Sequence, residues 1–170
     1  MVKMAFLQKF LRLTNKFYVE FGVGNSKQCN TRNLRENGGW CGLLMDRNYE
    51  NPKINLHQEF ITTENINHIL KKHSVPVEFD LLSIDIDFND FYIWKSLYEV
   101  YKPRVVVIEY NASHSPTEDK IVKYEPNFIW DGTNYFGASI RALYNLGKIK
   151  GYSLIYAESM GVNLFFVKDS

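Results

Sequence analysis

One short stretch, Phe17-Tyr-Val-Glu-Phe-Gly-Val-Gly-Asn25, limits the folds that are open to this chain. Its first half carries the aromatic and β-branched residues of a buried strand. Gly22 and Gly24 then let the backbone turn sharply and approach a ligand closely. Because a helical segment follows, the stretch predicts a strand, a glycine turn and a helix. Backbone N–H groups and small residues at the carboxyl end of a strand are typical of nucleotide-type sites.

Segments typical of strands and of helices alternate along the rest of the chain. We expect strands at 40–45, 54–61, 79–84, 104–109, 152–157 and 162–167, and helices at 31–37, 62–72, 91–100 and 139–146. Only residues 158–161 separate the last two strands, so these two must form an antiparallel hairpin. The alternation predicts an α/β fold with a mostly parallel sheet, helices on both faces and a C-terminal antiparallel hairpin.

Local signals indicate where several of these helices begin and end. Thr62 or Thr63 is expected to cap the second helix through its side-chain oxygen. Asn89 and Asp90 are expected to cap the third helix in the same way. Gly147 is expected to end the fourth, since glycine commonly follows the last turn of a helix.

Composition and charge narrow the class of protein and its partners. The 170 residues are enough for a single domain with a sizeable core. Twenty Lys and Arg against 19 Asp and Glu leave a net charge of +1, which disfavours a nucleic-acid partner without excluding one. Cys29 and Cys41 form neither a disulfide framework nor a metal motif, as is typical of a cytoplasmic protein. Residues 1–15 are expected to form an amphipathic helix that packs on the domain, with no segment in a membrane.

Carboxylates follow the second and fourth predicted strands. Asp46 ends the second, where an ionised carboxylate can accept both hydroxyls of a ribose. A dinucleotide fingerprint would need a third glycine where this chain has Lys27, which counts against NAD or FAD. Asp85 and Asp87 follow the fourth strand and would project to the same side of an extended chain. Such a pair holds a cation, binds a basic group or shares a proton.

Glu109 ends the fifth strand, which is expected to neighbour the strand that carries Asp85. Three roles stay open for Glu109. It can join Asp85 and Asp87 as an oxygen ligand of Mg²⁺ or a similar divalent cation, act as a general base, or pair with Arg141. His114 is the nearest candidate acid–base group in the loop that follows.

A long irregular segment, residues 111–136, follows the fifth strand and is called the lid segment below. Loops of this length in a compact domain tend to close over sites or bind ligands. We expect Asn111, Trp130, Asp131 and Tyr135 to contact a substrate, with Trp130 as an aromatic wall and the others as polar contacts.

Several stretches together resemble class I S-adenosylmethionine-dependent methyltransferases over nearly the whole chain. The glycine motif is Glu20-Phe-Gly-Val-Gly24, the acidic residue after the second strand is Asp46, and the acidic motif is Ser83-Ile-Asp-Ile-Asp87. The terminal hairpin is similar to the reversed seventh strand of that family. Stretches such as Arg104-Val-Val-Val-Ile-Glu-Tyr-Asn111 and Trp130-Asp-Gly-Thr-Asn-Tyr-Phe-Gly-Ala-Ser139 resemble the FkbM-like group of small methyltransferases within it.

The resemblance implies a Rossmann-like three-layer sandwich with strand order 3-2-1-4-5-7-6 and an S-adenosylmethionine site. The residues that it assigns to cofactor binding are Glu20, Gly22, Gly24, Asn25, Asp46, Glu59, Phe60 and Asp85. Glu20 either orients the turn or meets a cationic group of the ligand. Asp46 would hold the ribose, and Glu59 and Phe60 would border the adenine. Asp85, Asp87, Glu109 and His114 would serve catalysis.

The expected reaction is O-methylation of a small molecule or a glycan, in a site that a second protomer of a homodimer can help to close. An RNA ribose 2'-O-methyltransferase is one alternative, for which Lys16, Asp85 and Glu158 could supply part of a Lys-Asp-Lys-Glu set. A non-catalytic domain that binds the cofactor or a partner is the other.

Overall fold

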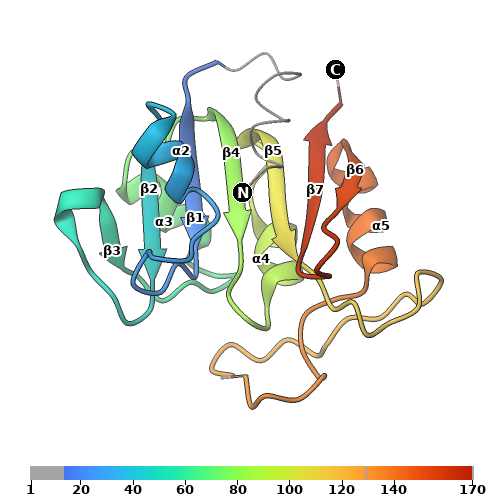
Figure 1. Ribbon diagram of the computed structural model, residues 1–170. Coiled ribbons are helices and arrows are strands. Elements are labelled where there is room, and N and C mark those ends of the chain that lie inside the picture. Colours follow the sequence, from blue (N-terminus) through green and yellow to red (C-terminus); the bar gives the residue numbers. More distant parts are fainter. Residues whose placement is uncertain (1–13, 129, 170) are drawn as a thin grey trace.

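Seven strands form one sheet, in the order β3-β2-β1-β4-β5-β7-β6 (Figure 1). The computed structural model describes residues 14–128 and 130–169. The strands are β1 Phe17–Phe21, β2 Cys41–Asp46, β3 Leu56–Gln58, β4 Glu78–Ile84, β5 Lys102–Glu109, β6 Tyr152–Ala157 and β7 Asn163–Lys168. The expected fold class and strand order are therefore confirmed.

Strand direction changes only at the C-terminal hairpin. β1 pairs in parallel with β2 and β4, β2 with β3, and β4 with β5. β7 runs antiparallel to β5 and to β6, as its short connection to β6 requires. The carboxyl ends of β1 to β5 therefore meet along one edge of the sheet, which we call the carboxyl edge.

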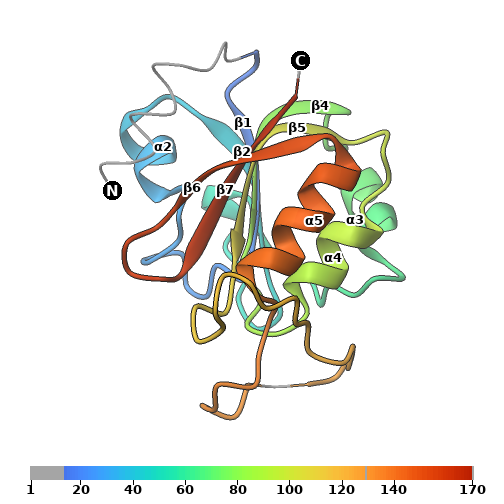
Figure 2. The ribbon, with the colours of Figure 1, turned by 90° about the vertical axis from the view of Figure 1, so that its right-hand side faces the viewer.

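Helices cover both faces of the sheet, and Figure 2 shows the sheet edge-on between them. The helices are α2 Arg32–Asn37, α3 Ile66–Lys72, α4 Asp90–Ser96 and α5 Ile140–Lys150, with a short 3₁₀ helix η1 at Pro52–Ile54. α2 lies on one face, where Leu34 packs with Leu44 of the sheet. The other three lie on the opposite face, where Trp94 and Leu143 pack with Phe166. The result is the expected three-layer sandwich.

Gly147 lies inside α5 and does not end it, so this expectation is wrong. The helix continues to Lys150 and ends at Gly151, whose φ of 77° is left-handed. A Cβ atom on Gly147 would lie 2.7 Å from the ring of Phe166 and 3.3 Å from that of Trp94. Gly147 therefore lets the helix approach β7 closely, which is a packing role that its neighbours in sequence do not reveal.

α3 begins later than expected, and its expected cap is wrong. Asn65, not Thr62 or Thr63, occupies the N-cap position. The Asn65 side chain accepts a hydrogen bond from the backbone N–H of Thr62 at 2.8 Å and donates to the carbonyl of Phe60 at 2.8 Å. These bonds hold residues 60–65 in a turn ahead of the helix.

α4 ends at Ser96, four residues before the expected end at Val100. The Asn67 side chain donates to the carbonyl of Ser96 at 2.9 Å, and Lys150 Nζ donates to the carbonyl of Leu97 at 3.0 Å. Side chains from α3 and α5 thus satisfy carbonyls that would otherwise continue the helix.

β3 is shorter than the strand expected over 54–61. Asn55 adopts a left-handed conformation with a φ of 54°, which separates η1 from the strand. Pairing with β2 runs only from Leu56 to Gln58. A strand of this length at the sheet edge presents few unpaired backbone groups to solvent.

Asp80, a buried carboxylate of β4, anchors the first described residues to the sheet. It accepts hydrogen bonds from the backbone N–H groups of Thr14, Asn15 and Lys16 at 2.7–3.0 Å and lies 3.5 Å from Arg104 Nε. The helix expected over 1–15 falls almost wholly outside the described residues. Within residues 14–128 and 130–169, each helix is too short or too polar to traverse a lipid bilayer.

Candidate functional site

Two cavities that share lining residues lie at the carboxyl edge around the glycine turn. The larger, of about 520 Å³, is lined among others by Glu20, Gly24, Asn25 and Asp85. The smaller, of about 270 Å³, is lined among others by Asp46, Glu59, Phe60 and Asp87. Gly22, Gly24 and Tyr49 line both. A cavity of the larger size is within the range of small-molecule and cofactor sites.

Gly22 and Gly24 need to be glycine for different physical reasons. Gly22 has a φ of 72°, and a Cβ there would collide with the carbonyl oxygen of Asp85. It is therefore needed where β1 and β4 approach each other. Gly24 has a φ of 53°, but a Cβ there would meet nothing within 4 Å. The absence of a side chain at Gly24 leaves open the space that a ligand at the turn would need.

Asp46 is held at the mouth of the smaller cavity by two backbone donors. Its Oδ2 accepts a hydrogen bond from Gly24 N–H at 2.8 Å, and its Oδ1 accepts one from Asn48 N–H at 2.8 Å. Each oxygen keeps a further lone pair, so the carboxylate can still accept a hydroxyl on either oxygen. The geometry is thus compatible with the expected ribose contact.

Glu20 orients the loop after the glycine turn, which is one of its two expected roles. Its carboxylate accepts hydrogen bonds from the backbone N–H of Asn30 at 2.6 Å and of Thr31 at 3.0 Å. Burial raises the pKa of Glu20, while these bonds act to lower it. Asn25 accepts a hydrogen bond from Lys27 N–H at 3.1 Å, which shapes the same loop beside the larger cavity.

Glu59 and Phe60 both line the smaller cavity, as a role beside the adenine would require. Glu59 Oε1 lies 2.7 Å from Lys72 Nζ and 2.7 Å from His73 Nε2, so its carboxylate is already partnered. Phe60 has the guanidinium of Arg47 above its ring, 5.4 Å from the centroid. We therefore expect Phe60 to offer a ring face and Glu59 to fix its loop.

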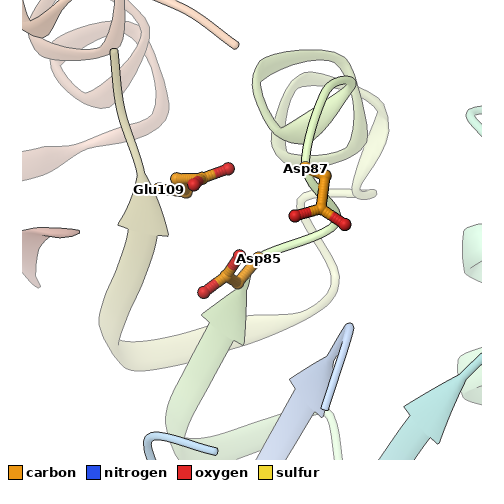
Figure 3. A group of neighbouring side chains, drawn as sticks. All are labelled: Asp85, Asp87 and Glu109. Atoms are coloured by element: carbon orange, nitrogen blue, oxygen red, sulfur yellow. The ribbon is translucent and has the colours of Figure 1, made fainter. Parts of the chain in front are cut away.

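Asp85, Asp87 and Glu109 converge at the carboxyl edge, and we call them the acidic cluster (Figure 3). One carboxylate oxygen of each lies within 4.8 Å of the others. Register explains part of this, because Ile84 of β4 pairs with Ile108 of β5 and so places the next residues, Asp85 and Glu109, side by side.

Asp87 reaches the cluster by a turn and not by extended alternation, which corrects the sequence argument. β4 ends at Ile84, and Asp87 has a left-handed φ of 70°. Left-handed backbone at a residue other than glycine is uncommon and tends to occur at functional sites. The expected closeness of Asp85 and Asp87 has therefore a different geometric origin.

The acidic cluster carries unfavourable electrostatics. Burial, followed by the charges of Asp90 and Asp87, raises the pKa of Asp85 well above that of an ordinary carboxyl. Burial and the neighbouring carboxylates raise the pKa of Glu109 further still. Burial and the charge of Asp46 raise the pKa of Asp87, and only Arg47 acts against them. Such shifts mark groups that accept protons or bind cations readily near neutral pH.

Sequence reasoning missed two polar residues beside the cluster. Asp90, expected to cap α4, is only 1% exposed; its Oδ1 accepts a hydrogen bond from Ile86 N–H at 2.8 Å, and its Oδ2 is buried without a partner. Asn163 of β7 pairs directly with Glu109 and also has a buried, unpartnered Oδ1. For Asp90, the usable signal was its place on the inward face of α4. Asn163 had none, because its position depends on strand pairing.

Asp90 lies inside α4, so it is not the cap that was expected. Asn89 does occupy the N-cap position, as expected, but its side chain makes no cap bond. Its amide instead contacts the backbone of Glu125 in the lid segment, donating to the carbonyl at 2.9 Å and accepting from the N–H at 3.4 Å. This contact connects the lid segment to the turn that carries Asp87.

Asn111 anchors the lid segment at its base. Its Nδ2 donates to the carbonyls of Asn134 at 2.8 Å and Phe136 at 3.0 Å, and its backbone N–H donates to Ala138 at 2.9 Å. The segment, which Figure 1 shows beyond the ends of the parallel strands, therefore leaves β5 and reaches the start of α5 at neighbouring points. Asn111 is buried, so its described contacts are with the chain itself.

The other expected substrate residues lie farther out on the lid segment. Trp130 Nε1 donates to the carbonyl of Thr133 at 2.8 Å, and Asp131 accepts from the Thr133 N–H at 3.0 Å. The Tyr135 hydroxyl accepts from Lys123 N–H at 3.3 Å. All three side chains are exposed and border neither cavity, so their contact with a substrate stays a prediction.

Two other lid residues, Pro126 and Phe128, do line the smaller cavity, and sequence reasoning missed them. The ring of Phe128 stacks on that of Phe88, with centroids 3.8 Å apart. Two stacked rings, one from the turn after β4 and one from the lid segment, thus form part of the lining of this cavity. Their meeting depends on how the lid segment folds back over the sheet, which no local pattern indicates.

Two further expectations concern Glu109 and His114. Arg141 lies over the ring of Tyr144 at 5.9 Å, and among the described residues it forms no ion pair with Glu109. Pairing with Arg141 is therefore ruled out as the role of Glu109 in this structure. His114 lies in the lid segment and is not one of the three residues that converge; its catalytic role stays a prediction.

Comparison with known proteins gives distant structural likenesses only. No family model matches the chain, and no curated protein matches it. It superposes on the crystal structure of TnmH with a TM-score of 0.49 and 13% identity, covering 91% of this chain and 50% of TnmH. The pyocyanin biosynthetic protein PhzM gives a TM-score of 0.45, 13% identity and coverage of 96% and 53%. LaPhzM gives a TM-score of 0.44 and 13% identity, covering 98% of this chain and 54% of LaPhzM.

The chain thus spans about half the length of these proteins. Its fold class rests on its own topology. A sheet in the order β3-β2-β1-β4-β5-β7-β6, with β7 reversed, is the order that the resemblance implied. The chain therefore has an α/β fold with the sheet order and the C-terminal antiparallel hairpin that were expected.

Proposed function

We propose that this protein is an S-adenosylmethionine-dependent methyltransferase that methylates an oxygen of a small molecule or a glycan. The observation that carries the proposal is Asp46, which lines the smaller cavity and is fixed by the N–H groups of Asn48 and of Gly24, a residue that borders both cavities. A carboxylate in this position is suited to bind the hydroxyls of a ribose. The turn at Gly24, which has no side chain, is suited to take the methionine part of the cofactor, which is attached to that ribose. Membership of the FkbM-like group is a further part of the proposal and rests on the sequence motifs.

The residues present fit the cofactor. Asp46 would hold the ribose, Phe60 and the Phe88–Phe128 pair would cover the adenine, and the open space at Gly24 would take the methionine part. The cofactor would supply an electrophilic methyl group. Positioning an acceptor oxygen about 3 Å from such a group accounts for much of the rate in reactions of this kind.

The acidic cluster is where we place the chemistry of the acceptor. Asp85 lines the larger cavity and Asp87 the smaller, so the cluster borders both. A hydroxyl acceptor must lose its proton as it reacts, and a carboxylate with a raised pKa is an effective general base near neutral pH. We assign this chemistry to the acidic cluster as a whole, either as a general base or as the ligands of a metal ion that lowers the pKa of the acceptor hydroxyl.

Lys16 argues against the RNA alternative. Its carbonyl pairs with Cys41 N–H at 3.1 Å, at the start of β1 and β2, whereas Asp85 lies beyond the end of β4. Since these strands are parallel, Lys16 and Asp85 lie at opposite ends of the sheet. The Lys-Asp-Lys-Glu set considered above is therefore not assembled from these residues.

Isothermal titration calorimetry with S-adenosylmethionine and S-adenosylhomocysteine tests the proposal. We expect both to bind with micromolar affinity, and no binding of either at millimolar concentration would overturn it. Formation of S-adenosylhomocysteine in the presence of hydroxylated acceptors then separates an enzyme from a domain that only binds the cofactor. Binding without any turnover across such acceptors would favour the non-catalytic alternative.

A further inference from the structure

We propose that Asp85, Asp87 and Glu109 bind a divalent metal ion that prefers oxygen ligands, at the carboxyl edge between β4 and β5. The use of this ion to orient an acceptor rests on the proposed function. Its binding does not, because the argument depends only on groups of this chain.

The spacing of the acidic cluster suits such an ion. Its three carboxylate oxygens lie within 4.8 Å of one another. Calcium–oxygen distances of about 2.3–2.6 Å put ligand oxygens up to roughly 5 Å apart, whereas Mg²⁺ at about 2.0–2.1 Å limits them to roughly 4 Å. Three oxygens within 4.8 Å of one another are therefore within the span of Ca²⁺ ligands, and Mg²⁺ or Mn²⁺ would require the side chains to move closer together.

None of the three carboxylates has another partner among the described residues. No hydrogen bond or ion pair within residues 14–128 and 130–169 involves the side chains of Asp85, Asp87 or Glu109, and Glu109 Oε2 is buried and unpartnered. Asp85 and Glu109 are only partly exposed, and Arg47 offsets charge at Asp87 alone. Grouped carboxylates that are partly removed from water without full charge compensation are costly. A bound cation offsets that cost.

Asp90 supplies an independent observation. Its Oδ1 bonds to the N–H of Ile86, which lies between Asp85 and Asp87, so the carboxyl folds back onto the turn that carries the cluster. It is 1% exposed, and its Oδ2 has no partner. A buried carboxylate oxygen such as Asp90 Oδ2 needs a hydrogen-bond donor. A water molecule bound to the metal ion would supply that donor.

Asn163 of β7 provides a second buried, unpartnered oxygen beside the acidic cluster. It pairs directly with Glu109 across β5 and β7, is 7% exposed, and has a buried, unpartnered Oδ1. Directly opposed residues in an antiparallel pair project to the same face, about 5 Å apart. Unpartnered oxygens from β5, from β7 and from the start of α4 therefore belong to residues that adjoin the acidic cluster.

Asp87 is the exposed member of the cluster, so an ion can enter from solvent at that side. A protonated amine of the acceptor is the other cation that carboxylates could bind. The metal is favoured because three carboxylate oxygens within 4.8 Å match one small ion, and an ammonium group has only three protons to share among them and the oxygens of Asp90 and Asn163.

The test measures thermal unfolding of the EDTA-treated protein with CaCl₂, MgCl₂ or MnCl₂, against NaCl at matched ionic strength. At about a hundredfold excess over the dissociation constant, we expect at least one ion to raise the Tm by about 5 °C or more. Asp85→Asn and Glu109→Gln should fold, since each relieves repulsion, but should lose that rise. Glu99→Gln removes an exposed carboxylate near the opposite end of β5 and should keep it.

Asp90→Asn separates positioning from folding. It should weaken metal affinity by roughly 10-fold to 100-fold while the Tm in EDTA stays close to that of the wild type or rises. The proposal is overturned if no ion raises the Tm at millimolar concentration, or if Asp85→Asn and Glu109→Gln keep the full rise. Calorimetry with S-adenosylmethionine on the same samples tests the proposed function separately. Cofactor binding without a metal response would overturn the proposed metal site and leave the proposed cofactor site standing.

Discussion

The backbone N–H of Gly24 donates to Oδ2 of Asp46 over 2.8 Å, which joins the turn after β1 to the end of β2. The bond fixes a carboxylate and a bare stretch of backbone in one relative position before any ligand arrives. Preorganisation of this kind reduces the entropy lost on binding. It also means that a change at Asp46 affects the ligand and the turn together.

Asp46→Asn should weaken S-adenosylmethionine binding by about 10-fold to 100-fold, because a hydrogen bond to a charged group contributes about 1.5–3 kcal/mol. The variant keeps the shape of the side chain but loses the charge and one acceptor. Calorimetry measures the change, with Glu99→Gln as the control that keeps wild-type affinity. Equal affinity of Asp46→Asn and wild type would remove the ribose assignment.

Gly147→Ala should destabilise the protein by about 1–3 kcal/mol, although alanine normally stabilises the interior of a helix. The added Cβ would lie 2.7 Å from the ring of Phe166, so α5 and β7 must separate. Urea unfolding measures the loss. The double variant Gly147→Ala/Phe166→Leu should recover part of it, and a stabilising Gly147→Ala would show that the contact is not restrictive.

The stability contributed by Glu59 should depend on pH. Burial acts to raise its pKa, but hydrogen bonds from Lys72 and His73 outweigh burial and hold the pKa below the ordinary value of 4.5. A lowered carboxyl pKa in the folded state adds stability above the unfolded pKa, and this is lost as the pH falls through the folded value. Glu59→Gln should therefore cost about 1 kcal/mol at pH 7.

The difference between Glu59→Gln and wild type should shrink as the pH falls below about 4.5, where the unfolded carboxyl takes up its proton. Thermal unfolding from pH 7 to pH 3 gives the profile. A difference that stays constant over this range would mean that Glu59 acts by packing and not by charge.

Asp80→Ala should cost about 3 kcal/mol or more, since it leaves the N–H groups of Thr14, Asn15 and Lys16 without their acceptor. Asp80→Asn keeps one acceptor oxygen and should cost less. Urea unfolding compares the two, and cofactor affinity at low temperature should change little in either, because Asp80 lies toward the start of β4, away from the carboxyl edge. Equal stability of the alanine variant and wild type would contradict the anchoring role.

The fold could be predicted because its signals are local. Most of the strands are apolar runs bounded by turn residues, and the short link at 158–161 permits only a hairpin. Gly147 and the start of α3 were mispredicted for the opposite reason. Whether a glycine ends a helix or packs inside it depends here on Phe166, which belongs to a different strand.

The site residues likewise fall into those that local sequence signals predict and those that depend on tertiary structure. Asp46, Asp85 and Glu109 could be found because each ends a strand or directly follows one, and strand ends of a parallel sheet share an edge. Asp90 looked like a cap, since Asp at the start of a helix usually is one. Asn163 and Phe128 reach the site only through the β5–β7 register and the path of the lid segment, which are tertiary properties.

The hydrogen bond from Asn111 N–H to the carbonyl of Ala138, 2.9 Å long, has an evolutionary consequence. Residues 112–137 form an excursion whose two ends already meet, so the excursion can be lengthened, shortened or exchanged as a module. Doubling the length of such a loop costs only about 0.6 kcal/mol in closure entropy. If the proposed function holds, acceptor preference can change by replacement of this module, while Gly24, Asp46 and the strand ends beneath it stay unchanged.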